Sequence, residues 1–231
     1  KLIEGTNEIL TANRNSLQLF DMLHSMRQFD DLTYVHSVNV ALIASILGQW
    51  LKFSEKDIRI LTISGLLHDI GKIMIPNEIL TKPGKLTVAE YNIMKQHVNF
   101  GYEKVKNQNI DIRIKEACLL HHEKCDGTGY PFGLKSDHIP AVAKIIAIAD
   151  VYDAMTSARV YRGALCPFEV IDTMYKDAFT KFEPEYILPF LKNVASSYIN
   201  NDVRLSDGRI GKVVLINENA LSLPIVQCED E

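Results

Sequence analysis

The chain has 231 residues, of which 47% are apolar and 23% are charged, and its formal net charge is -4. This length can bury a sizeable core in one main domain, and the composition is typical of a soluble globular protein rather than a disordered or fibrous one. The negative net charge argues against a broad basic surface for extended nucleic acid, which needs clustered Lys and Arg. Any phosphate ligand must therefore be held locally.

The cysteines and the longest apolar run indicate the cellular setting. The four cysteines are irregularly spaced without a CxxC pair, which favours a reducing cytoplasm over a disulfide framework or a zinc knuckle. The longest apolar run, residues 40–47, is far shorter than the roughly 20 residues that span a bilayer, so we expect no membrane segment. Because the sequence begins at Lys1 without a methionine, we interpret it as a piece of a longer protein, with an upstream sensor domain as one expected partner.

Two amphipathic helices are predicted in the first part of the chain. Residues 6–26 carry apolar side chains at mostly helical spacing, and this helix would either pack on the body or pair with a second chain in a homodimer. The second helix follows Asp30 and ends near Leu51, with His36 near its start. Its predicted apolar stripe consists of Leu32, Val35, Val38, Leu42, Ile43, Ile46 and Leu47.

Capping patterns locate the helices that follow. Ser54 with Asp57 resembles a capping box and predicts a helix that delivers His68 and Asp69 at its end. Residues 76–85 contain two prolines and a glycine, so we expect them to form a loop.

Thr87 and Glu90 form a true capping box, which predicts a helix with His97 two to three turns after its start. Another helix should cover residues 111–121. It would end at the adjacent histidines His121 and His122, just before a glycine-rich stretch.

The glycine-rich stretch, residues 125–133, predicts an irregular loop. Residues 141–158 are almost continuously apolar up to Asp150, which indicates a buried helix that carries one out-of-place carboxylate. Pro167 and Pro184 then mark the first turns of two further helices.

The C-terminal tail differs in kind from the rest of the chain. Short strands are predicted at residues 203–205, 210–216 and 221–226, with a Ser-Asp-Gly turn between the first two. The expected fold class is therefore mainly α, with a small C-terminal β appendage. We expect an N-terminal helix, a main helical domain and a β-rich extension, bounded at residues 1–29, 30–200 and 201–231.

Paired imidazoles and carboxylates carry the chemistry. His68 and Asp69 follow an apolar helix, and an ionised carboxylate in an apolar setting is costly unless it is paired or bound to a metal. A single histidine is usually structural, and His24 and His138 keep that interpretation. Five imidazoles and two carboxylates without thiolate suit two ions such as iron or manganese better than structural zinc. The set is His36, His68, Asp69, His97, His121, His122 and Asp150.

Four segments together resemble the HD-GYP family of cyclic di-GMP phosphodiesterases. They are LLHDIGKIMIPNEILTKPGKLT, MKQH, HHEKCDGTGYP and IAIADVYDAMTSARVYR, and the resemblance covers about residues 30–191. HDxGK alone is shared with the wider HD superfamily of metal-dependent phosphohydrolases. Its combination with HHExxDGxGYP at this spacing is specific. The resemblance implies an HD-type helical bundle with a metal-dependent catalytic domain at residues 30–200.

The resemblance also implies roles for individual residues. All seven residues of the set become metal ligands, with Asp69 as the bridge between two divalent ions, Fe or Mn. Lys72 would contact a phosphate oxygen, and it forms the catalytic pair with Asp69. Arg159 and Arg162 would hold the phosphates of the substrate.

The family's namesake loop contains Gly129, Tyr130 and Pro131. It would shape the substrate groove or dock a diguanylate cyclase-type partner, and a purely structural turn is an equal alternative. Two positions depart from the family pattern. Leu32 stands where some members carry a glutamate for a third metal, which favours two metals, and Lys124 replaces the usual arginine and loses its planar fork.

The expected reaction is attack of a metal-bridging hydroxide on phosphorus, which opens cyclic di-GMP to linear pGpG, with further conversion to GMP. One alternative is a phosphodiesterase for another cyclic dinucleotide, because the metal ligands do not select the base. A second is a catalytically silent module that binds a cyclic dinucleotide or a partner protein. A third is an all-helical interaction module with incidental histidines, which would bind no metal.

Overall fold

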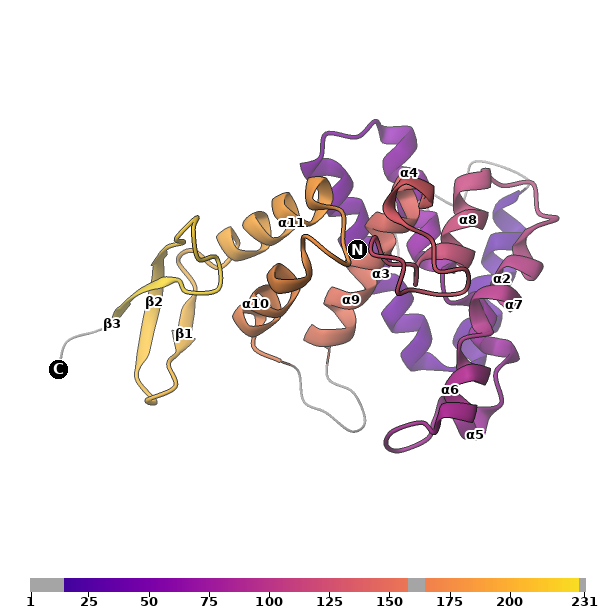
Figure 1. Ribbon diagram of the computed structural model, residues 1–231, viewed down its shortest axis with the longest axis horizontal. Coiled ribbons are helices and arrows are strands. Elements are labelled where there is room, and N and C mark those ends of the chain that lie inside the picture. The colour runs from indigo at the N-terminus through magenta and orange to yellow at the C-terminus, as the bar shows by residue number, and fades with distance from the viewer. Residues whose placement is uncertain (1–14, 158–164, 229–231) are drawn as a thin grey trace.

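The computed structural model describes residues 15–157 and 165–228 (Figure 1). They form a mainly α-helical body followed by a small antiparallel sheet, which confirms the predicted fold class. The elements are α2 (Asn15–Phe29), α3 (Asp31–Trp50), α4 (Glu55–Leu67), η1 (Ile70–Met74), α5 (Asn77–Leu80), α6 (Val88–Met94), α7 (His97–Val105), α8 (Ile112–Leu120), η2 (Ser136–His138), α9 (Ala141–Thr156), α10 (Pro167–Asp177), α11 (Pro184–Ser196), β1 (Asp202–Arg204), β2 (Ile210–Leu215) and β3 (Ile225–Cys228).

Four helices form the centre of the body: α4 and α9 pack against each other, and both contact α3 and α8. Local caps explain where three of them begin. Side chains of Asp30, Ser54 and Asp111 accept backbone N–H groups in the first turns of α3, α4 and α8, which satisfies donors that a helix leaves unpaired. The predicted helix starts after Asp30 and Ser54 are therefore confirmed.

The predicted apolar stripe of α3 is confirmed in part, because Leu47 is buried and Val38 and Ile43 pack against the core, but three of its residues are exposed. Leu32, Val35 and Leu42 are 64%, 53% and 41% exposed. The buried face instead consists mainly of small residues, which let α4 and α9 approach closely. Its members are Thr33, Ser37, Val40, Ala41, Ala44, Leu47 and Gly48.

Among the described residues, α3 is also the one helix whose length and hydropathy would let it cross a membrane. A core helix of a soluble protein passes the same test. Packing of α3 against α4 and α9 accounts for its apolar composition, and its His36 lies within hydrogen-bonding distance of two carboxylates.

Two further expectations need correction. Residues 76–85 were expected to form a loop, but they include the short helix α5, which seats the buried side chain of Ile79 in the body. His97 was expected two to three turns into a helix. The chain instead leaves α6 at Met94 and His97 is the first residue of α7. The capping box of Thr87 and Glu90 is confirmed.

The C-terminal sheet has the strand order β1-β2-β3, and both pairs are antiparallel. The third strand begins at Ile225 rather than at the predicted Leu221, because residues 217–223 form turns and Pro224 has no N–H to donate to a ladder. Val213 of β2 is fully buried in the same apolar cluster as Leu191 of α11. In Figure 1 the sheet follows α11 at one end of the molecule.

The N-terminal helix packs on the body. Leu23 and Met26 of α2 are buried, and α2 contacts α3 and η1. The predicted part of this helix before Asn15 lies outside the described residues. The domain boundaries at residues 29 and 200 stay predictions.

Candidate metal centre

The seven predicted ligands come together from five parts of the chain. His36 lies in α3 and Asp150 in α9, and the remaining five lie at helix ends. His68 ends α4, Asp69 precedes η1, His97 begins α7, and His121 and His122 follow α8. Their polar atoms meet in one cluster, most of which is buried. We call this group the His/Asp cluster.

The close packing of η1 on α7 brings Asp69 to His97. A Cβ atom on Gly71 would lie 1.9 Å from the carbonyl oxygen of His97 and 2.4 Å from the amide nitrogen of Gly101. Only glycine leaves room for this backbone contact. The glycine of the HDIGK motif is therefore needed to hold two ends of the chain at the cluster.

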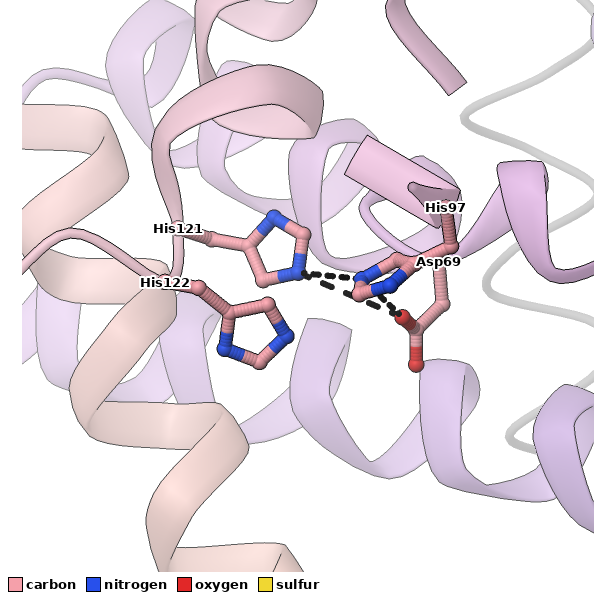
Figure 2. A group of neighbouring side chains, drawn as sticks. All are labelled: Asp69, His97, His121 and His122. Atoms are coloured by element: carbon pink, nitrogen blue, oxygen red, sulfur yellow. Dashed lines mark hydrogen bonds and ion pairs between the residues drawn. The ribbon is translucent and has the colours of Figure 1, made fainter. Parts of the chain in front are cut away.

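The carboxylate of Asp69 faces two separate histidine groups. Its Oδ2 atom lies 3.2 Å from Nε2 of His68 and 3.6 Å from Nε2 of His36. Its Oδ1 atom lies 3.3 Å from Nε2 of His97 and 4.0 Å from Nε2 of His121. Figure 2 shows this second group with His122, all directed toward one another. A carboxylate between two sets of imidazoles has the arrangement of a bridging ligand.

Asp150 completes the cluster on the side of His36. Its Oδ1 atom lies 3.0 Å from Nε2 of His36 and 4.0 Å from Nε2 of His68. Its Oδ2 atom lies 3.9 Å from Nδ1 of His122. The carboxylate that seemed out of place in an apolar helix therefore faces three imidazoles.

Backbone carbonyls fix the tautomers of three histidines. Nδ1 of His68, His97 and His121 lies 2.8, 2.8 and 2.9 Å from the carbonyl oxygens of residues 65, 94 and 117. Each Nδ1 must donate to its carbonyl, so each Nε2 presents a lone pair to the cluster. This is the arrangement that orients histidine ligands in metal sites.

Unpaired polar atoms show that the cluster suits a cation. Within the described residues, Nε2 of His68 and Oδ1 of Asp69 are buried without a hydrogen-bond partner. Nε2 of His97 and Nε2 of His121 are 3.4 Å apart, and neither has a proton to donate when Nδ1 carries it. Buried acceptors that face one another are costly. A divalent ion would satisfy them, and the donor set fits it.

Burial and nearby charges set the protonation states. Burial lowers the pKa of His122 to about 3 and lowers the pKa values of His97 and His121 as well. Burial opposes ionisation of Asp69, but electrostatic attraction to His68 and to the Lys72 ammonium outweighs it and holds the pKa of Asp69 well below its usual range. Neutral imidazoles and an ionised carboxylate are the forms that bind metal.

His36 differs from these histidines. Burial opposes its protonation, but hydrogen bonds to Asp150 and Asp153 outweigh burial and raise its pKa to about 9. Near neutral pH a proton on His36 therefore links α3 to α9, and a metal ion would compete with that proton.

We therefore predict that the free energy of unfolding of metal-free protein falls as pH rises from about 7 to above 9. Because the pKa of His36 is raised from 6.5 to about 9, its contribution is fully present below pH 6.5 and is lost as pH passes through about 9. The shift corresponds to at most about 3 kcal/mol. Thermal unfolding of chelator-treated protein measures it, with His36→Gln as the control that should lose this part of the pH dependence. A Tm that rises over this range would contradict the prediction.

Lys72, which the family resemblance predicts to contact a phosphate oxygen, lies beside the cluster. Its Nζ atom donates to Oδ2 of Asp69 at 2.6 Å, and its side chain is 20% exposed. One end of the lysine thus reaches the cluster while part of it faces solvent. Arg159 and Arg162, the other predicted phosphate contacts, lie outside the described residues.

The namesake loop packs directly on the cluster. The ring of Tyr130 stacks on that of His122 with centroids 4.7 Å apart, and a cis peptide bond precedes Pro131. A Cβ atom on Gly129 would lie 2.5 Å from backbone atoms of residues 123 and 124, so glycine is required for this close approach. The loop therefore has a structural role beside His122.

Sequence reasoning missed two buried carboxylates. Glu123 accepts backbone N–H groups of Phe132 and Leu134 at 2.7 and 2.8 Å and so holds the namesake loop. Asp153 accepts from Nδ1 of His36 at 2.6 Å. The available signal was position: Glu123 follows the paired histidines directly, and Asp153 lies one turn after Asp150 in an apolar helix.

The residues left out of the predicted set lie apart from the cluster. His138 is exposed beside Asp137, and His24 is hydrogen-bonded to Gln28 on the exposed side of α2. Leu32 is exposed one turn before His36 and has no ligand atom to offer. Lys124 is also exposed.

The fold and the cluster agree with the match to a protein family. A family model described as HD domain matches residues 9–186. The chain therefore belongs to the HD domain family, whose members are metal-dependent, and the recognition of HD-GYP motifs is confirmed.

The chain is also similar to individual curated phosphodiesterases. Cyclic di-GMP phosphodiesterase PA4108 of Pseudomonas aeruginosa is 36% identical over 203 residues, which cover 87% of this chain and 49% of the relative. The 3'3'-cGAMP-specific phosphodiesterase 2 of Vibrio cholerae is 32% identical over 188 residues, which cover 80% of this chain and 36% of the relative. The chain thus spans about half the length of its curated relatives, or less.

A solved structure supports the fold. The HD domain of the Listeria monocytogenes phosphodiesterase PgpH, in complex with cyclic-di-AMP, matches with a TM-score of 0.59 and 18% sequence identity. The match covers 77% of this chain and 95% of that chain. At this identity the likeness shows the HD fold alone.

Proposed function

We propose that this chain is a metal-dependent phosphodiesterase that hydrolyses cyclic di-GMP to linear pGpG, with GMP as a slower further product. The observation that carries the proposal is the carboxylate of Asp69, whose two oxygens face separate groups of imidazoles in a buried cluster. The similarity to a curated cyclic di-GMP phosphodiesterase over 87% of the chain supports the substrate.

The proposed cofactors are two divalent ions, iron or manganese. One position would be held by His36, His68 and Asp150 and the other by the three remaining histidines, with Asp69 shared between them. Bound ions would lower the pKa of a coordinated water and offset the charge that gathers on the phosphoryl group. The mixed imidazole and carboxylate ligands suit these metals.

The chain's own residues would bind and orient the substrate. The ammonium group of Lys72 lies beside Asp69 and would pair with a phosphate oxygen next to the scissile bond. From their place in the family motif, Arg159 and Arg162 would hold the substrate's phosphates, as expected from the sequence. Burial of His68, His97 and His121 limits the access of bulk water to the reacting atoms.

Lys72→Met is expected to lower kcat/KM for cyclic di-GMP by roughly 10–100-fold while both metal ions stay bound. The reason is the loss of a charge-assisted hydrogen bond to phosphate, worth about 1.5–3 kcal/mol. Lys115→Met is the matched control, because the ammonium group of Lys115 donates to the carbonyl of Lys106 on the surface. Unchanged kinetics in the Lys72 variant would remove Lys72 from the phosphate site.

The test of the substrate is a turnover assay on protein purified without oxygen and loaded with Fe²⁺ or Mn²⁺. Cyclic di-GMP and 3'3'-cGAMP should be compared at equal concentration, because one curated relative is specific for 3'3'-cGAMP. Faster hydrolysis of 3'3'-cGAMP would favour the alternative substrate. Two bound metals without hydrolysis of either dinucleotide would favour a silent binding module.

The proposal also covers the location, the oligomeric state and the partners of the protein. We propose a cytoplasmic protein that acts as a homodimer under the control of an upstream sensor domain. A diguanylate cyclase-type partner would dock on the namesake loop, where Phe132 is 61% exposed. Size measurement by light scattering tests the dimer, and a pull-down with wild-type and Phe132→Ser protein tests the docking.

A further inference from the structure

A carboxylate outside the predicted ligand set lies behind His36. Asp153 is on α9, one turn after Asp150, and only 4% of it is exposed. Its Oδ2 atom accepts a hydrogen bond from Nδ1 of His36 at 2.6 Å, and its Oδ1 atom accepts from Oγ of Ser157 at 3.0 Å. Both oxygens are therefore fixed, and the ring of His36 is held with Nε2 toward the cluster.

The outer partner of His36 differs from those of three other histidines. His68, His97 and His121 donate Nδ1–H to neutral backbone carbonyls, whereas His36 donates to a carboxylate. A carboxylate behind an imidazole fixes its tautomer and makes the opposite nitrogen a stronger metal ligand.

The two sides of the cluster also differ in charge. The side built on His36 and His68 contains Asp150 and Oδ2 of Asp69, with Asp153 directly behind, so among the described residues its carboxylates outnumber the one ammonium group beside them, that of Lys72 at Oδ2 of Asp69. The side built on the remaining three histidines shares Asp69, and Asp150 is farther from it, with Oδ2 3.9 Å from Nδ1 of His122 compared with 3.0 Å between Oδ1 and Nε2 of His36. A divalent cation is therefore attracted more strongly to the first side.

We propose that Asp153 is a positioning residue for the metal position at His36, and that it makes the two metal positions unequal in affinity. The position at His36 and His68 binds its ion more tightly than the position at His97, His121 and His122. This inference rests on the metal pair of the proposed function, and it does not depend on which dinucleotide is the substrate.

The experiment is a titration of metal-depleted protein with Mn²⁺, followed by calorimetry and by elemental analysis after dialysis. Wild-type protein is expected to bind two ions with distinct affinities. Asp153→Ala should weaken the tighter binding event by roughly 10–100-fold and leave the other unchanged. Asp153→Asn should restore only part of the loss, because its amide oxygen still accepts from Nδ1 of His36 but carries no negative charge.

Combining Asp153→Ala with a second substitution, His97→Gln, shows which of the two metal positions is weakened. His97→Gln removes a ligand from the weaker position, so the ion that remains should show the full effect of Asp153→Ala. Asp57→Ala is the matched control, because Asp57 forms its ion pair with Arg113 between α4 and α8 at 2.7 Å, outside the cluster. Both Mn²⁺ affinities should be unchanged in this control.

Several results would overturn the inference. They are wild-type affinities in Asp153→Ala, an equal loss at both positions, or a wild-type protein that binds a single ion. Circular dichroism of the metal-free variants checks folding. If Asp153→Ala does not fold, Ser157→Ala is tested in its place. Loss of the Ser157 hydroxyl releases Oδ1 of Asp153 and should weaken the tighter Mn²⁺ binding roughly 2–10-fold. An unchanged affinity in this variant would overturn the inference.

Failure of the proposed substrate gives a different result. Protein that binds two Mn²⁺ ions with the expected dependence on Asp153 but leaves cyclic di-GMP intact would refute the substrate and leave this inference standing.

Discussion

Asp69→Asn is expected to lower turnover of cyclic di-GMP by on the order of 10³-fold, or about 4 kcal/mol of transition-state stabilisation. The two oxygens of Asp69 face both groups of histidines closely: Oδ2 lies 3.2 Å from Nε2 of His68, and Oδ1 lies 3.3 Å from Nε2 of His97. Asparagine has nearly the same shape but offers a single oxygen and no charge. Binding of both ions should therefore weaken together, unlike the selective effect expected for Asp153.

Turnover and metal content must be measured on the same sample. Asp57→Asn is the control, because it alters a carboxylate on α4 whose partner is Arg113 rather than the cluster. Retention of two ions and of full turnover in Asp69→Asn would refute the bridging role. Loss of turnover with both ions retained would instead assign Asp69 to substrate orientation.

Local sequence signals predicted the starts of helices well where a capping side chain or a proline sets them. Asp30 and Ser54 begin helices by accepting backbone N–H groups within three residues, and Pro167 and Pro184 occupy first turns. Such interactions depend on neighbours in the sequence. The positions of these helix starts could therefore be predicted without knowledge of the tertiary fold.

Contacts between residues far apart in the sequence were harder to predict. The bond between His36 and Asp153 joins positions 117 residues apart, and the place of Asp153 one turn after Asp150 does not by itself identify His36 as its partner. Part of the predicted apolar stripe of α3 is exposed, because small residues such as Ala41 and Ala44 are buried in place of larger apolar ones such as Leu42. Packing distance, not hydropathy alone, decided which face was buried.

The sequence predicted which residues lie in the candidate site, but it did not predict how they are arranged. The family motifs named seven candidate ligands, and the structure brings these seven side chains together. The motifs could not show that Asp69 divides its two oxygens between separate histidine groups, because that depends on how the ends of α4 and α8 meet the start of α7. They also gave no reason for the glycine two residues after Asp69.

Gly71→Ala is expected to destabilise the fold by about 3 kcal/mol or more and to reduce metal binding at His97. The new Cβ atom would lie 1.9 Å from the carbonyl oxygen of His97, so η1 must move away from α7. That movement would separate Asp69 from His97, whose Oδ1 and Nε2 atoms are 3.3 Å apart.

The matched control lies on the opposite side of the same contact. In Gly101→Ala the nearest atom to the new Cβ is the amide nitrogen of Gly71 at 3.4 Å, an ordinary contact. Because alanine favours a helix over glycine by about 0.5–1 kcal/mol, this variant should be neutral or slightly more stable. Denaturant unfolding and Mn²⁺ titration of both variants measure the difference. Equal stability of the two would show that the approach of η1 to α7 is not what requires glycine, and the HDIGK glycine would then need another explanation.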